Sequence, residues 1–249
     1  MKTIQLTLLL LAICSTYLYT QSAEEILAKY TEVTGGQERW DQVHSMKVTG
    51  TAKLIAQNME LHFTRIRTRK GPQITSLKVN GMDYIETAFD GTMVWGSNNT
   101  MQPAEKDADA SENVKRAIPE FPYPAHNWKA NGFTAKYLGK EHLDSIEVFK
   151  IKLTKRPQLV AGEEVENSMI YYFDTKRYVP VLTETMTMSG PSKGQLMRAT
   201  LSDYREVDGY LYPFLGSMMM GDQIFQVLET ETVEFNGKIE DSIFKMPGG

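Results

Sequence analysis

The spacing of hydrophobic residues changes near residue 45, from the period of a helix to the period of a strand. Before this point the apolar residues that share one helical face are Ile26, Leu27, Tyr30 and Val33. Ser22 and Glu25 have the spacing of a capping box, and Gly35-Gly36 is a typical helix stop. We therefore predict an N-terminal helix that ends at the two glycines, followed by a short helical turn over 37–43 that carries Trp40.

After residue 45, apolar and polar residues alternate, which is typical of half-buried antiparallel strands. The clearest alternation is at Met46, Val48, Ala52 and Leu54, and then at Met59, Leu61 and Phe63. Dipeptides that favour type I′ hairpin turns are Asn80-Gly81, Asp90-Gly91, Asn131-Gly132, Asp208-Gly209 and Asn236-Gly237. Further strands are predicted near residues 179–188, 195–207, 210–219 and 223–235. The pattern predicts one mainly β domain, with about ten or eleven strands that pair as successive hairpins.

Two segments interrupt this alternation. Residues 102–117 are polar and rich in charge, which predicts a short exposed helix. Residues 119–128 contain three prolines among aromatic side chains. Because proline cannot donate a hydrogen bond to a neighbouring strand, this stretch is predicted to be a loop or a segment that covers the sheet.

Residues 1–22 have the layout of a secretory signal peptide. Lys2 precedes an apolar run over 6–13, which is too short for a permanent membrane span, and small and polar residues follow. Ile13 stands where lipid attachment to Cys14 would require a small residue, so no lipid anchor is expected. We therefore predict a signal peptide over 1–22 and a single domain over 23–249, exported to the periplasm.

Composition and motifs argue against several classes of function. A net charge of −4 leaves no basic excess for nucleic acid, and a single cysteine excludes an intramolecular disulfide. No metal-ligand spacing is found among His44, His62, His126 and His142. Residues 190–194 match G-x-S-x-G only formally, because they lie between two strand-like runs instead of a strand and a helix. We expect no catalytic residues, no metal and no cofactor.

Methionine is frequent, with 14 residues, and it is interleaved with aromatic residues along the predicted strands. One interpretation is an ordinary core. The other is an apolar cavity for acyl chains, enclosed by a curved sheet and covered by the N-terminal helix, since methionine adapts to varied apolar partners. The candidate cavity residues are Met46, Val48, Met59, Leu61, Phe63, Trp95, Met169 and Tyr171. Strand parity groups them without showing which face lies inside.

The strand that contains Phe63 becomes basic along the same face. This basic stretch consists of Arg65, Arg67 and Arg69, with Lys70 beside them. Either the strand leaves the core here and becomes solvated, or these side chains form a basic rim at the cavity mouth. Such a rim would bind a lipid phosphate or carboxylate.

Short motifs in a fixed order give the chain a resemblance to the outer-membrane lipoprotein-sorting proteins, the LolA/LolB-like family, and especially to its Bacteroidetes-type members. The motifs are Ala23–Tyr30, Thr34–Gly36 with Trp40, Ser45–Thr51, Met59–Leu61, Phe89–Trp95, Tyr172–Val181, Leu201–Gly209 and Asp241–Pro247. Carriers of this family keep an arginine just before a proline. Here Gly71 precedes Pro72, and the nearest basic residues are Arg69 and Lys70.

The resemblance implies an incomplete β-barrel, with an N-terminal helix and a short helix as a lid over an apolar cavity. Our first hypothesis is a non-catalytic periplasmic carrier for the acyl chains of lipoproteins or other lipids, which acts in outer-membrane lipoprotein sorting. Its partners would be the lipid and a membrane acceptor protein. The alternative is an envelope-stress sensor or protein-binding module with the same fold.

Overall fold

The computed structural model describes residues 21–96, 105–188 and 192–246. The predicted signal peptide, including Cys14, lies outside the described residues except for its last two positions, and so does the start of the 190–194 motif.

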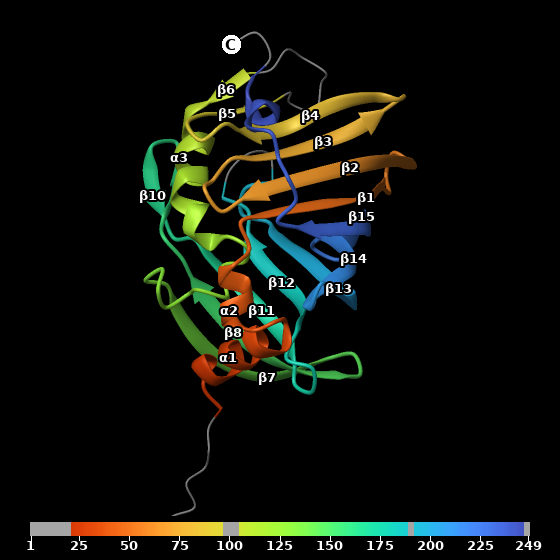
Figure 1. Ribbon diagram of the computed structural model, residues 1–249. Helices are drawn as coiled ribbons and strands as arrows, with labels where there is room; N and C mark the ends of the chain where they lie inside the picture. Colours follow the sequence, from red (N-terminus) through yellow and green to blue (C-terminus); the bar gives the residue numbers. More distant parts are fainter. Residues whose placement is uncertain (1–20, 97–104, 189–191, 247–249) are drawn as a thin grey trace, which may run out of the picture.

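The described part of the chain is dominated by one curved antiparallel sheet of thirteen strands (Figure 1). In pairing order the strands are β6 (Glu105–Asp107), β5 (Val94–Gly96), β4 (Met82–Phe89), β3 (Gln73–Val79), β2 (Met59–Thr68), β1 (Ser45–Leu54), β15 (Gln223–Phe235), β14 (Tyr210–Met220), β13 (Leu196–Val207), β12 (Pro180–Met186), β11 (Ser168–Asp174), β8 (Ile146–Thr154) and β7 (Thr134–Leu143). A separate hairpin pairs β9 (Gln158–Val160) with β10 (Glu163–Val165). Strands β6 and β7 are the two edges, so the sheet is not closed into a barrel.

Three α-helices and two short 3-10 helices accompany the strands. They are α1 (Ala23–Val33), α2 (Gln37–Asp41), α3 (Ala108–Ala117), η1 (Ile118–Glu120) and η2 (Asp241–Phe244). The capping box at the start of α1 is formed as predicted, with Glu25 N donating to Ser22 Oγ at 3.1 Å and Ser22 N donating to Glu25 Oε2 at 2.9 Å. None of the helices in the described ranges combines the length and apolar character of a bilayer span.

The sheet has an inner face, against which α1, α2 and the covering segment (residues 118–133) pack. Helix α1 buries Ile26 and Leu27 against β8 and β11. Trp40 of α2 is 1% exposed and packs on β1, β2, β14 and β15. The covering segment contributes Phe121 to the same core. The predicted covering role of this stretch is confirmed.

A smaller core lies on the opposite, outer face of the sheet. It is built from Ile66, Ile74, Ala88 and Trp95, which are in register across β2, β3, β4 and β5. Phe244 of η2 covers it, and Trp95 Nε1 donates a hydrogen bond to the Phe244 carbonyl at 2.8 Å. The C-terminal segment therefore shields a patch that would otherwise be exposed.

The predicted sheet class and the four long strands from residue 179 onward are confirmed. The predicted number of strands is wrong, because the described residues form fifteen. Strands β5, β6, β9 and β10 have three residues each, too few to show an alternation. The predicted polar helix is confirmed for residues 108–117, whereas residues 105–107 form an edge strand.

The turn dipeptides differ in their outcome. Asn80-Gly81 and Asp208-Gly209 have positive φ at both residues and join paired strands, as predicted. Asp90-Gly91 lies in the connection between the paired strands β4 and β5. The hairpin prediction is wrong for Asn131-Gly132, which ends the covering segment, and for Asn236-Gly237, which follows the last strand. In each of these two dipeptides only one residue has positive φ, Gly132 in the first and Asn236 in the second, so neither has the type I′ conformation.

Candidate functional site

An aromatic cluster fills the part of the inner face that the helices cover. Trp40 lies at its centre, with its ring centroid 4.5 Å from that of Tyr210 and 4.7 Å from that of His126. The Trp40 indole donates to Thr34 Oγ1 at 3.3 Å. Tyr123 of the covering segment packs edge-on at 5.8 Å. This half of the inner face is a packed core.

His126 is the buried titratable group of this cluster. It is 5% exposed and stacks on Tyr30 at 4.8 Å. Its Nδ1 lies 3.3 Å from Thr31 Oγ1, and that hydroxyl donates to the Leu27 carbonyl at 3.1 Å, so the Nδ1–H is the donor to Thr31. Its buried Nε2 has no hydrogen-bond partner. Burial lowers the pKa of His126 to about 3, so the imidazole is neutral in the folded protein.

The turn between α1 and α2 is tied to the β13–β14 hairpin by three hydrogen bonds. Leu211 N donates to the Thr34 carbonyl at 3.1 Å. Arg39 Nη1 donates to the Asp208 carbonyl at 3.2 Å, and Tyr210 Oη donates to the Arg39 carbonyl at 2.9 Å. We call α1, α2 and the covering segment the lid. All three hydrogen bonds join the lid to the sheet, so the lid is attached to the sheet at this end.

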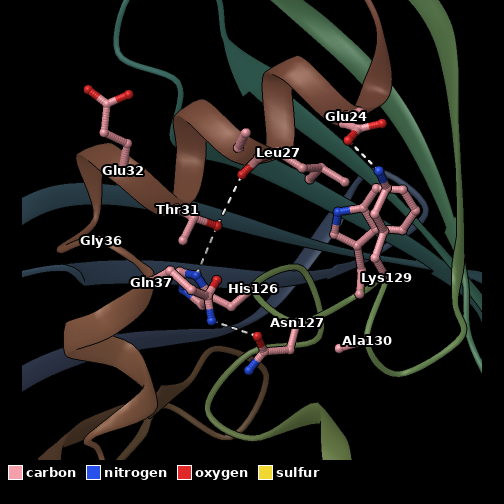
Figure 2. Close-up of a pocket in the computed structure, with 12 residues that line it drawn as sticks. Glu24, Leu27, Thr31, Glu32, Gly36, Gln37, His126, Asn127, Lys129 and Ala130 are labelled. Carbon is pink, nitrogen blue, oxygen red and sulfur yellow. Dashed lines mark hydrogen bonds and ion pairs between the residues drawn. The ribbon is translucent and has the colours of Figure 1, made fainter.

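A groove lies between α1 and the end of the covering segment (Figure 2), with a volume of about 480 Å³. Polar contacts cross it: Lys129 forms an ion pair with Glu24, and Gln37 Nε2 donates to Asn127 Oδ1 at 2.6 Å. The groove is a seam between α1 and the covering segment, bridged by polar contacts.

The inner face also carries a row of methionines, which we call the methionine surface (Met59, Met169, Met197, Met218 and Met220); Met169 borders the α1 core. Strand register places them on the same face as the core. Met59 is opposite Leu54, Met197 is opposite Met220, and Met169 is opposite the fully buried Leu153.

Met218 shares this face because it follows the buried Phe214 at even spacing along β14. The register shift between β14 and β15 at this point skips a residue of β15, so it does not change the alternation along β14. In Figure 1 strands β1 and β2 extend to the right of α1 and α2.

The methionine surface is apolar without being buried. Met59 is 45% exposed, and the other four are half-buried. Flexible thioether side chains that remain accessible on a curved sheet are suited to contact apolar ligands of varied shape. Met197, Met218 and Met220 are site residues that the sequence pattern did not predict. The even spacing of the last two from Phe214 was the signal that would have found them.

The eight predicted cavity residues do not form one group. Met46, Val48 and Phe63 belong to the covered core beside Trp40, and Leu61 is buried on the same strand face. Met169 and Tyr171 lie near α1, and Met59 is at the open end. The grouping of Trp95 with them is wrong, because Trp95 packs in the outer core under η2. Sequence parity cannot relate the faces of strands whose register is unknown.

The basic stretch divides in the same way. Arg69 donates to the Val43 and Trp40 carbonyls, both at 2.7 Å, and so holds the chain that follows α2. Arg67 donates to the Pro122 carbonyl at 3.0 Å. Arg65 and Lys70 are exposed. The four residues therefore do not form a continuous rim.

Groups suited to metal or acid–base chemistry are sparse in the described structure. Among the described residues, no group of three or more His, Cys, Asp or Glu side chains is placed to hold a metal ion. His62 lies 3.7 Å from Glu231 on the outer face, and both side chains are more than half exposed.

Comparison with solved structures identifies the fold. A LolA superfamily protein from Nitrosomonas europaea matches with a TM-score of 0.56 and 13% identity, over 90% of this chain and 98% of that one. The chain has the LolA-like fold. A DUF1329 family protein from Desulfovibrio piger matches with a TM-score of 0.54 and 10% identity, over 88% of this chain and 97% of that one.

A third structure with the LolA-like fold is described as an outer membrane lipoprotein-sorting protein domain, from Vibrio parahaemolyticus. It matches with a TM-score of 0.52 and 12% identity, over 89% of this chain and 97% of that one. No model of a protein family matches the sequence, and no curated protein does. At these identities the likeness establishes the fold, and the residues must supply the function.

Proposed function

We propose that this protein is a non-catalytic carrier that binds acyl chains of lipoproteins or other lipids on the methionine surface. The observation that supports this most directly is the row of accessible methionines on the inner face, which begins at Met169 beside the α1 core and continues to Met59. We further propose that it acts in the periplasm in lipoprotein sorting, because residues 1–22 have the layout of an export signal.

Burial alone supplies the affinity in this proposal. Each methylene group removed from water contributes about 0.8 kcal/mol, so a partly buried acyl chain gains several kcal/mol before the cost of immobilising it. The exposed side chains of Met59 and its neighbours repack at little cost, since methionine has three rotatable bonds. No covalent step is needed, and release requires only an acceptor that buries the chain better.

Two adjacent methionines of β14 provide a matched test. Met218 faces the methionine surface, whereas Met219 faces outward and is opposite Arg198. We expect Met218→Asp to weaken binding of a fluorescent fatty acid at least about tenfold, since it puts a charge into an apolar contact. Met219→Asp makes the same chemical change on the other face and should leave the affinity unchanged. Equal effects of the two variants would refute the assigned face.

A second experiment identifies the ligand. The protein is purified from its native envelope without detergent and studied by native mass spectrometry, followed by lipid extraction. We expect a stoichiometric adduct with the mass of a lipid or lipopeptide, and its identity distinguishes phospholipid from lipoprotein cargo. If the protein carries no adduct and also takes up no fluorescent fatty acid, the carrier proposal is wrong.

A further inference from the structure

Two arginines of β2 lie on the inner face, next to buried core residues. Arg65 is opposite Val48, and Arg67 is opposite Met46, both on β1 and both buried. Strand β2 runs from Met59 at the open end to these arginines, a distance of about 20 Å from Met59 to Arg65 at the usual rise per residue. Met59 of the methionine surface and the two guanidinium groups are therefore on the same face of one strand, with the buried Leu61 and Phe63 between them.

Within residues 21–96, 105–188 and 192–246, neither guanidinium forms an ion pair with a carboxylate. Among the described residues, Arg67 makes one hydrogen bond, to the Pro122 carbonyl, and lies 5.7 Å from the Phe121 ring centroid. Arg65 lies 5.9 Å from the Phe63 ring centroid. Glu120 is the carboxylate whose charge acts to raise the pKa of Arg67. Its carboxylate is already paired with Lys155 at 2.8 Å.

Two tyrosines of this region extend the set of donors. Burial raises the pKa of Tyr123 and that of Tyr212, and the neighbouring Arg67 opposes the rise at both hydroxyls. Burial together with the charge of Arg65 lowers the pKa of Arg67. Both tyrosines pack against the core cluster of Met46, Val48 and Phe121, which the two arginines adjoin, so this region combines positive charge with neutral O–H donors.

This arrangement is costly unless an anion completes it. Like charges repel, and a partly buried guanidinium group without a counter-ion loses hydration that one carbonyl does not replace. Arginine has five N–H donors in a planar fork that matches a carboxylate or phosphate. Arg69 shows the contrast, since it uses Nε and Nη2 on two backbone carbonyls and has a structural role.

We propose that Arg65 and Arg67 form the binding site for the acid group, a carboxylate or a phosphate, of a lipid whose acyl chain lies on the methionine surface. This inference rests on the proposed carrier function and adds selectivity to it: the ligand is an acidic lipid. The exposed Arg65 makes the first contact, and Arg67 with the two tyrosines receives the acid group beneath the covering segment.

The test compares cis-parinaric acid with its methyl ester, which has the same chain and no charge. We expect the acid to bind at least about tenfold more tightly than the ester, and Arg65→Gln and Arg67→Gln each to remove most of that difference. Lys78→Gln is the matched control, because Lys78 is an exposed cation on the outer face of the neighbouring strand β3. It should change neither affinity.

The outcomes separate this inference from the carrier function. If the acid and the ester bind equally well and Arg65→Gln changes neither, the acid-group site is refuted while the carrier function stands. Arg67→Gln also removes the hydrogen bond to Pro122, so a loss of both ligands in that variant alone reports a loosened lid. Arg65→Gln then decides, since Arg65 holds no lid carbonyl.

Inorganic phosphate is the third probe and distinguishes the source of the anion. Competition by phosphate against parinaric acid supports a site that accepts a free anion, whereas no competition supports a site that also requires the chain. If neither lipid binds, the carrier function fails. In that case phosphate-dependent thermal stabilisation that is lost in Arg65→Gln would still support the anion site, and its absence would overturn both proposals.

Discussion

Replacing His126 by phenylalanine tests whether one buried neutral imidazole makes the lid sensitive to acid. His126 stacks between Tyr30 of α1 and Trp40 of α2, with ring centroids 4.8 and 4.7 Å away. Phenylalanine preserves this stacking and cannot be protonated. Thr31 Oγ1 retains its bond to the Leu27 carbonyl in the variant. The change therefore removes the titration and leaves the aromatic packing in place.

The size of the effect follows from the two pKa values of His126. The pKa is about 3 in the folded protein and about 6.5 for an unperturbed histidine. Below pH 6.5 the unfolded chain binds a proton that the folded protein does not, so the free energy of unfolding falls as the pH falls. The loss is about 1.4 kcal/mol per pH unit, which amounts to about 2.7 kcal/mol at pH 4.5. Stability from this group is complete above pH 6.5.

The assay is denaturant unfolding of the wild-type protein and the variant between pH 4.5 and pH 7.5. We expect the two stability curves to be parallel above pH 6.5 and to diverge below it, with the wild type losing more. Carboxylates titrate equally in both proteins, so the difference isolates His126. His142→Gln, at an exposed position of β7, is the control and should follow the wild type. Parallel curves down to pH 4.5 would refute the assigned burial of a neutral His126.

Two further predictions concern the core. Trp40→Ala should reduce the free energy of unfolding by about 3–5 kcal/mol, because Trp40 is 1% exposed and lies at the centre of the aromatic cluster. Equilibrium unfolding measures this loss, and a value below about 1 kcal/mol would contradict the central place of Trp40. Lys155→Met should cost about 3–5 kcal/mol, because it leaves the carboxylate of Glu120 buried without its partner, where the two side chains are 11% and 10% exposed. Glu120→Gln in the same background should recover part of that stability, and no recovery would argue against the ion pair as the cause.

The sequence by itself determined the class of the fold and most of its long elements. The helical stripe with its capping box predicted α1, and the period of two predicted the long strands, including β12 to β15, to within one or two residues. The prolines of residues 119–128 predicted a covering segment. These features are local, because helix capping, strand alternation and the missing N–H of proline depend on neighbours in the sequence.

Only the tertiary structure decided which strand faces share a core and where the ligand site lies. The sequence grouped Trp95 with Phe63, yet they belong to opposite faces, because the register across β2, β3, β4 and β5 relates them. The register of β2, β1, β15 and β14 brings Met59 and Met218 onto one surface from distant parts of the chain. A shift of one residue in pairing would exchange the faces, and register is set by long-range contacts that no local pattern contains.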